Sequence, residues 1–186
     1  DWSSDVCSSD LVSCGDTFGP GGTVVLAADL LGCSTSAAIT LVGPVELDLN
    51  GHTISCINTN DAYRSGILVG GTGAKVSNGV ITTCGAGVTV TGGGKHKIAD
   101  LTVHASAVGM RVLSHKNRID RNTFMDNIYH GIGIEGSENR LSHNTGVNND
   151  MSVAPTGVKN SLEKNTITDT LYAYVDEGES TKRSEE

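Results

Sequence analysis

Basic residues that recur at a nearly constant interval are the clearest candidates for a binding surface. One series consists of Lys75, Lys97, Arg118 and Arg140, and a second series, two positions earlier in its repeats, of Lys95, Lys116 and Lys159. Side chains two positions apart on a strand point the same way, so both series should face solvent together. Such a surface could hold the carboxylates of an acidic polysaccharide, with Asp120 close by. The alternative is a solvated face without a ligand, partly neutralised by Asp120, Glu138 and Glu163.

The acidic residues suggest a second chemistry. If the repeats stack as strands do, Asp120 and Glu163 lie two layers apart, about 9.6 Å. That is near the upper end of the roughly 6.5–9.5 Å that separates the carboxyl groups of an inverting glycosidase. The sequence has no aspartate cluster of the polygalacturonase kind, and no tight acidic group beside an arginine is expected, as a calcium-dependent lyase would need. The sequence therefore identifies no catalytic residues.

Other cofactor and partner classes have little support. The six histidines fall at different positions of the repeat, so we expect them mostly at the surface or at corners, without a metal site: His52, His96, His104, His115, His130 and His143. Paired Cys-x-x-Cys spacing, a phosphate loop and an aromatic row are absent, so we expect no metal, no cofactor and no nucleic acid partner. No apolar run approaches the roughly 18 residues of a membrane span.

The elements that position these residues follow an internal repeat. An aliphatic anchor recurs with spacings of 29, 22, 21, 22 and 21 residues, at Leu47, Val76, Ile98, Ile119, Leu141 and Leu162. A short strand that begins with glycine precedes most anchors, and a third short apolar stretch follows them. Helical repeats need a longer period, about 33–47 residues. The pattern predicts an all-β, right-handed parallel β-helix with three short strands per coil and about six coils.

Asparagines recur at the same interval in two further series. The first is Asn117, Asn139 and Asn160, and the second is Asn122, Asn144 and Asn165. Asparagine tolerates left-handed backbone at a sharp corner, and its amide can hydrogen-bond to an identical residue in the next layer. We expect both series to form structural ladders rather than a ligand site.

Three segments carry a resemblance to a known family. Cys14-Gly15-Asp16-Thr17, Ala28-Asp29-Leu30-Leu31-Gly32-Cys33 and the stretch 45–54, Val-Glu-Leu-Asp-Leu-Asn-Gly-His-Thr-Ile, resemble the opening of secreted prokaryotic right-handed β-helix repeat proteins. The resemblance extends from residue 14 to about residue 170. It implies a cap that follows a signal peptide and an extracellular or cell-surface location, or alternatively a periplasmic one. Proteins of this architecture include pectate lyases, polygalacturonases, alginate epimerases, phage tailspikes and NosD-like accessory proteins, so the fold does not assign an activity.

The cysteines fit an oxidising compartment. Cys14 and Cys33 bracket the cap, and a bridge between them would contribute about 3 kcal/mol by loop entropy. Cys56 and Cys84 fall within about one residue of register on adjacent coils, so they could also pair. The alternative for the second pair is two free buried thiols.

The two ends look foreign to the fold. Residues 1–11 resemble a translated sequencing adapter, as do residues 183–186, and we expect neither segment to be native. Without their five acidic residues and one arginine the formal net charge changes from −8 to −4. The remaining chain divides into a cap and first strand (12–45), β-helix coils (46–170) and a fading last coil or linker (171–182).

Three functional hypotheses follow from this organisation. One is a secreted or cell-surface scaffold that binds acidic polysaccharide along the basic residues, expected to be a monomer. Another is the N-terminal fragment of a polysaccharide lyase, epimerase or hydrolase whose active-site coils lie elsewhere. The third is a NosD-like periplasmic accessory protein.

Overall fold

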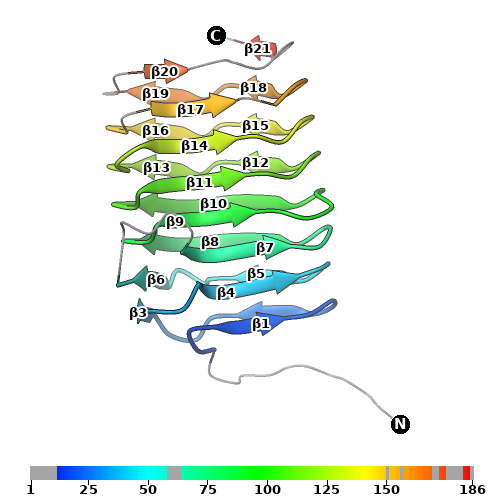
Figure 1. Ribbon diagram of the computed structural model, residues 1–186, viewed down its shortest axis with the longest axis vertical. Coiled ribbons are helices and arrows are strands. Elements are labelled where there is room, and N and C mark those ends of the chain that lie inside the picture. Colours follow the sequence, from blue (N-terminus) through cyan, green and yellow to red (C-terminus); the bar gives the residue numbers. More distant parts are fainter. Residues whose placement is uncertain are drawn as a thin grey trace.

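The fold was obtained as a computed structural model, and every element in its described part is a β-strand. The strands stack as successive layers of one column (Figure 1). The structure describes residues 12–57, 64–149, 151–155, 157–168, 172–174 and 182–184, the backbone alone for 151–155, 172–174 and 182–184. Residues 1–11, predicted to be adapter-derived, lie outside the described residues, as do 185 and 186.

The first face of the column, face A, is an eight-stranded parallel sheet. Its strands, in order, are β1 (Asp16–Phe18), β4 (Ala37–Val42), β7 (Ser65–Gly70), β9 (Ala86–Val90), β11 (Val108–Val112), β14 (His130–Ile134), β17 (Met151–Pro155) and β20 (Tyr172–Tyr174).

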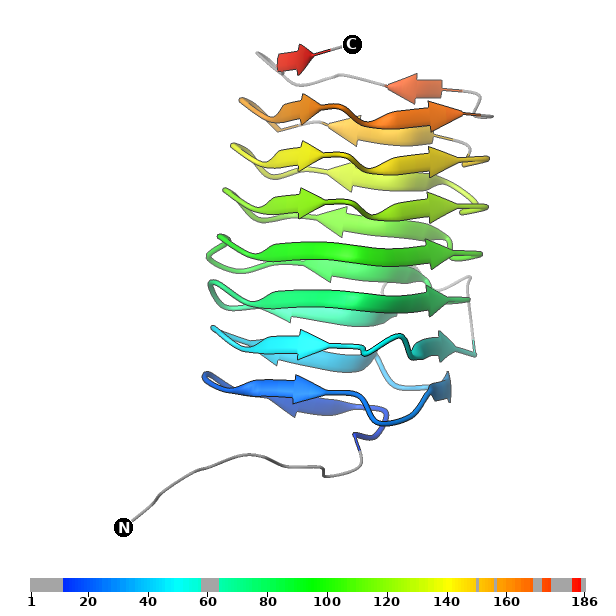
Figure 2. The same ribbon diagram turned by 180° about the vertical axis from the view of Figure 1, so that it is seen from behind.

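The opposite side of the column holds two more faces, which form one continuous sheet (Figure 2). Face B contains β2 (Thr23–Val25), β5 (Glu46–Asp48), the first parts of β8 (Lys75–Thr82) and β10 (Lys97–His104), β12 (Arg118–Asp120), β15 (Arg140–Ser142), β18 (Ser161–Glu163) and β21 (Lys182–Ser184). Face C contains β3 (Leu30–Cys33), β6 (Thr53–Cys56), the second parts of β8 and β10, β13 (Thr123–Met125), β16 (Thr145–Val147) and β19 (Thr166–Thr168). The faces are joined because β8 and β10 each run through both.

The aliphatic anchors form a single interior row, as the repeat predicts. Leu47 pairs with Val76, Val76 with Ile98, and the row continues through Ile119, Leu141 and Leu162 without a slip in register. All six side chains are buried. Because burial of an aliphatic side chain contributes about 1.5–3 kcal/mol, this row both fixes the register and stabilises the column.

Glycine at the start of the face A strands has a steric cause. A Cβ on Gly87 would lie 2.2 Å from Val103 Cγ1 and 2.6 Å from the Gly109 carbonyl oxygen of the next coil. Gly109 is limited in the same way by Gly131 and Phe124. Glycine therefore stands at the second position of these strands because the next coil passes directly over it.

Both predicted asparagine ladders form, and the bonds that their backbone N–H groups donate all run in one direction. The backbone N–H of Asn117 donates to Oδ1 of Asn139 at 2.9 Å, and that of Asn139 donates to Oδ1 of Asn160 at 2.9 Å. The second ladder repeats this through Asn122, Asn144 and Asn165. Each coil thus supplies the acceptors that satisfy the corner amides of the coil before it.

A third ladder was not predicted. The N–H of Ser106 donates to Oδ1 of Asn127, and the N–H of Asn127 donates to Oδ1 of Asn149. The spacing of 22 between Asn127 and Asn149 was the available signal. Each of the three corners of a coil therefore has its own ladder.

The predicted backbone geometry at these corners was wrong by one residue. The ladder asparagines do not have positive φ; the residue before each one does, for example Lys116 at 58°, Arg121 at 55° and Asp126 at 54°. The left-handed residue makes the turn and points outward, while the asparagine that follows is free to bury its amide.

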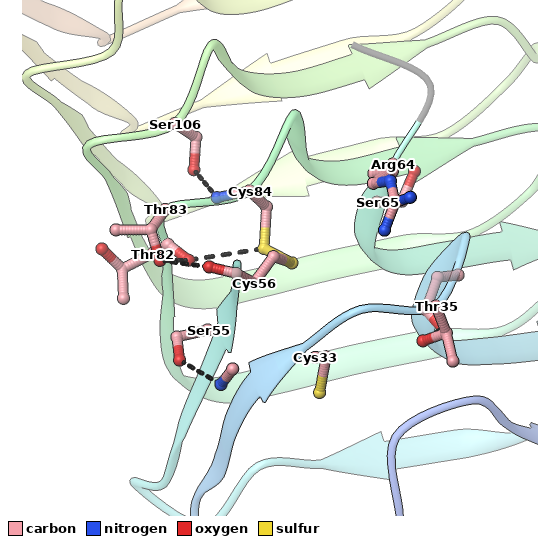
Figure 3. The surroundings of a disulfide bond; sticks show 12 residues. Cys33, Thr35, Ser55, Cys56, Arg64, Ser65, Thr82, Thr83, Cys84 and Ser106 are labelled. Atoms are coloured by element: carbon pink, nitrogen blue, oxygen red, sulfur yellow. Dashed lines mark hydrogen bonds between the residues drawn. A yellow bond between two sulfur atoms is a disulfide. The ribbon is translucent and has the colours of Figure 1, made fainter. Parts of the chain in front are cut away.

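Two disulfides cross-link the N-terminal part of the column. Cys14 pairs with Cys33, and Cys56 pairs with Cys84, so the second pair is not two free thiols. Figure 3 shows the Cys56–Cys84 bridge, where the N–H of Cys84 also donates to Ser106 Oγ at 3.2 Å. The bridge therefore continues the third ladder toward the N-terminus.

Parallel strand pairing extends into the segment predicted as a cap and also beyond residue 170. In the segment predicted as a cap, β1, β2 and β3 already pair in parallel with β4, β5 and β6. Beyond residue 170, β20 extends face A and β21 extends face B.

Candidate binding site on face B

The first basic series forms one vertical column on face B. Lys75, Lys97, Arg118 and Arg140 are successive register partners, and all four side chains are exposed. Alternation along the strands explains this, because each lies one position before a buried anchor. Like charges stacked at about 4.8 Å repel one another, so neighbouring acidic groups decide what charge remains.

The second basic series lies at the corner that precedes face B, not on a strand. Lys95, Lys116 and Lys159 have φ of 61°, 58° and 59°, so they are the left-handed residues that make this turn. All three are exposed, as predicted. Glu138 occupies the same corner between Lys116 and Lys159, which interrupts the series of positive charges.

Acidic neighbours pair with much of the basic surface. Lys75 Nζ lies 2.9 Å from Glu46 Oε2, Arg140 Nη2 lies 2.7 Å from Glu163 Oε2, and Lys116 Nζ lies 3.8 Å from Glu138 Oε2. Within the described residues, Lys95, Lys97 and Lys159 form no ion pair. The unneutralised charge is therefore centred on Lys97 of face B and on Lys95 at the corner that precedes it.

Asp120 is not available as a ligand group, contrary to expectation. Its side chain is only 5% exposed, and it accepts hydrogen bonds from Ser142 Oγ at 2.6 Å and His143 Nδ1 at 3.2 Å. Partial burial acts to raise the pKa of Asp120, but these hydrogen bonds and the charges of Arg121 and Arg118 outweigh it and hold the pKa below its ordinary value. Asp120 is thus an ionised, internally paired carboxylate.

An acidic group beside an arginine does exist, which the sequence analysis missed. Arg121 donates to both carboxylate oxygens of Asp100, from Nε at 2.8 Å and Nη2 at 2.9 Å, and its Nη1 also contacts Asp120. Asp100 lies one coil below Arg121 at the same corner position. The 21-residue spacing was present in the sequence, but the corner geometry was not evident from it.

The hypothetical pair of Asp120 and Glu163 is separated by Ser142, which lies between them in register. Glu163 accepts a hydrogen bond from Ser161 Oγ at 2.8 Å, and this bond is the main reason its pKa is lowered, with Arg140 adding to the effect. Because both carboxyl groups favour the charged form, neither is suited to donate a proton as a general acid. The arrangement gives no support to glycosidase chemistry at this pair.

His96 lies at a corner, one of the two places expected for the histidines, but its side chain is fully buried. It occupies the ladder position below Asn117, whose Oδ1 accepts from the His96 N–H at 3.0 Å. Its Nδ1 accepts from the Ala74 N–H at 3.1 Å, so the ring proton is on Nε2, which donates to the Thr91 carbonyl at 3.0 Å. Burial lowers the pKa of His96, which fixes it as a neutral structural residue.

The pockets found among the described residues lie away from the basic series. Two cavities, of about 320 and 440 Å³, lie at the N-terminal end of the column, the first lined by residues 12–14 and 26–31 and the second by 17–24 and Val45. Neither contains a residue of the basic series. Across the described part of the chain, no three His, Cys, Asp or Glu side chains are grouped so that they could hold a metal ion, and no helix could cross a membrane.

Comparison with known proteins identifies the fold family. No curated protein and no solved structure matches the chain. A family model described as "right handed beta helix region" matches residues 44–171, which is more than half of the 186 residues and contains the basic columns and all three ladders. The chain therefore belongs to the right-handed β-helix family.

Proposed function

We propose that the protein is a β-helix scaffold that binds an acidic polysaccharide along face B, outside the cell or at its surface. The observation that supports this most is the position of Lys97. It is exposed, lies in register between Lys75 and Arg118, and has no ion pair within the described residues.

A polyuronate is the ligand class that fits such a column. It carries a carboxylate on every sugar, so a chain lying along the column axis would meet cations at successive layers about 4.8 Å apart. Arg118 has a planar guanidinium group, which can hold a carboxylate with two hydrogen bonds and lies 3.7 Å from Asp120. Arg140 would exchange its contact with Glu163 for the ligand carboxylate. Binding would be sensitive to salt because the contacts are exposed.

The pockets found among the described residues contain no residue of the basic column, which favours binding over catalysis. The carboxylates of face B are already used: Asp120 by Ser142 and His143, and Glu163 by Ser161 and Arg140. The two disulfides are compatible with secretion, since such bonds persist in oxidising compartments.

Retention on a polyuronate gel tests the proposal. The variant Lys97→Ala/Arg118→Ala/Arg140→Ala should be retained less than the wild type. Exposed charge pairs contribute about 0.2–1 kcal/mol each, so three should weaken binding by roughly 3- to 100-fold at low salt.

A comparison of two single substitutions distinguishes an effect of the basic column from an effect of the net charge of the protein. Arg111 is a cation on face A, paired with Glu135 at 2.9 Å. Lys97→Ala should reduce retention, whereas Arg111→Ala should not. Unchanged retention of the triple variant would exclude the proposed site. A rise in ultraviolet absorbance of the polyuronate during incubation would instead indicate a lyase.

A further inference from the structure

Face C carries a regular and uncharged outer surface. Its two outward columns contain no Asp, Glu, Lys or Arg at any register position. The first column is Thr53, Val80, Thr102, Thr123, Thr145 and Thr166, and the second is Ser55, Thr82, His104, Met125, Val147 and Thr168. Every residue of the first column is β-branched, and four consecutive coils carry threonine.

The hydroxyl groups of this threonine column are not used by the protein. Within the described residues, Thr102, Thr123, Thr145 and Thr166 make no side-chain hydrogen bond to another protein group. Threonines elsewhere do: Thr89 Oγ1 bonds to Ser65 Oγ at 2.7 Å, and Thr91 Oγ1 donates to the Val69 carbonyl at 3.1 Å. Thr166 is exposed and the other three are half-buried, so hydroxyl groups on four consecutive layers are left without a protein partner.

The column is also rigid before any ligand arrives. Threonine has restricted χ1, and the parallel pairing of β10, β13, β16 and β19 fixes the backbone beneath it. Figure 2 shows these strands stacked above one another with their ends aligned. A ligand would therefore meet a periodic array with about 4.8 Å between layers, and little conformational entropy would be lost on binding.

The composition of the face excludes most partners. The twelve outward residues include no Trp, Tyr or Phe, so a sugar ring has no stacking platform. Protein interfaces depend on Trp, Tyr and Arg anchors, and none is present. A polyelectrolyte needs opposite charge, and the face has none. The partner class that fits this composition is a neutral lattice with its own regular repeat of hydrogen-bonding groups.

We propose that face C binds ice, the ordered water lattice. The hydroxyl groups would join the lattice, the methyl groups would order water between them, and many weak contacts would act together because each layer repeats the last. His104, Met125 and Val147 interrupt the second column, so the first column carries the binding. The proposal is independent of polysaccharide binding on face B.

Ice affinity and inhibition of ice recrystallisation test this surface. The wild-type protein should be incorporated into a slowly growing ice front and should keep ice grains small. Thr123→Lys/Thr145→Lys should lose both effects while circular dichroism and melting temperature stay unchanged. The matched control is Thr17→Lys/Thr40→Lys, which places the same charges on register neighbours of face A and should behave as the wild type.

A second variant tests the proposal if the lysine variant does not fold. Thr123→Val/Thr145→Val keeps the shape of the face but removes two hydroxyl groups, and it should show a partial loss. Exclusion of the wild-type protein from ice, or equal activity in wild type and the lysine variant, would overturn the proposal. A concentration-dependent dimer in light scattering that the lysine variant abolishes would do so too, because the face would then bind a second copy.

Discussion

The asparagine ladders allow a quantitative prediction about stability. In the first ladder Asn139 accepts from the Asn117 backbone N–H at 2.9 Å and donates from Nδ2 to the Ser114 carbonyl at 3.1 Å. Asn139→Ala removes these bonds and the one that Asn117 Nδ2 donates to Oδ1 at 2.8 Å, and it leaves the two backbone groups without a partner in the interior. Each unsatisfied buried group costs about 1–3 kcal/mol, so the free energy of unfolding should fall by about 3 kcal/mol.

The matched control is the same substitution at a half-buried rung. Asn165 has equivalent bonds, accepting from the Asn144 N–H at 2.9 Å and donating to the Leu141 carbonyl at 3.1 Å, but it is partly exposed. Water can replace these bonds after Asn165→Ala, so the loss should be about 1 kcal/mol.

Urea unfolding followed by circular dichroism measures both variants. The free energy of unfolding should fall clearly more for Asn139→Ala than for Asn165→Ala. Equal losses would mean that unsatisfied backbone groups do not determine the cost. A loss below about 1 kcal/mol at Asn139 would mean that the ladder contributes no more than an ordinary solvated hydrogen bond.

Two further perturbations test the neutral histidine and the second disulfide. Because burial lowers the pKa of His96, the native state binds fewer protons than the unfolded chain, so stability should fall as pH drops through the unfolded value of about 6.5. His96→Asn, which restores the residue type of the ladder, should reduce the difference in unfolding free energy between about pH 7.5 and about pH 5.5, and an undiminished difference would implicate another group. Cys56→Ser/Cys84→Ser opens a loop with a sequence separation of 28 and should cost about 3–4 kcal/mol. Thermal melts with and without reductant measure that cost, and a wild-type melting temperature that reductant does not change would contradict it.

The register of the column could be predicted from the sequence because one rule governs it. Ile98, Ile119 and Leu141 are spaced by 21 and 22 residues, and each must be buried, so a one-residue slip would expose the row. The exposure of Lys97 and Arg118 follows directly from that register. The solenoid architecture and the outward basic column were therefore within reach of pattern reasoning.

Contacts at the corners were not predictable in the same way. His96 stands 21 residues before Asn117, but residue type suggested only a surface or corner position. The ladder geometry is what shows that an imidazole can replace an amide there. Arg121 reaches Asp100 and Asp120 because a left-handed residue redirects its side chain across coils. Periodicity gives the layer of a residue but not the direction of its side chain at a turn.

The one-way orientation of the backbone N–H bonds in the ladders has a consequence for how the protein is made. During synthesis the N-terminal coils leave the ribosome first, yet the corner amides of each coil wait for oxygens that belong to the following one. The most recently emerged coil is therefore always incomplete, and its successor finishes it. The column should therefore assemble coil by coil from the N-terminus to the C-terminus. At each stage only the last coil has corner N–H groups without an acceptor.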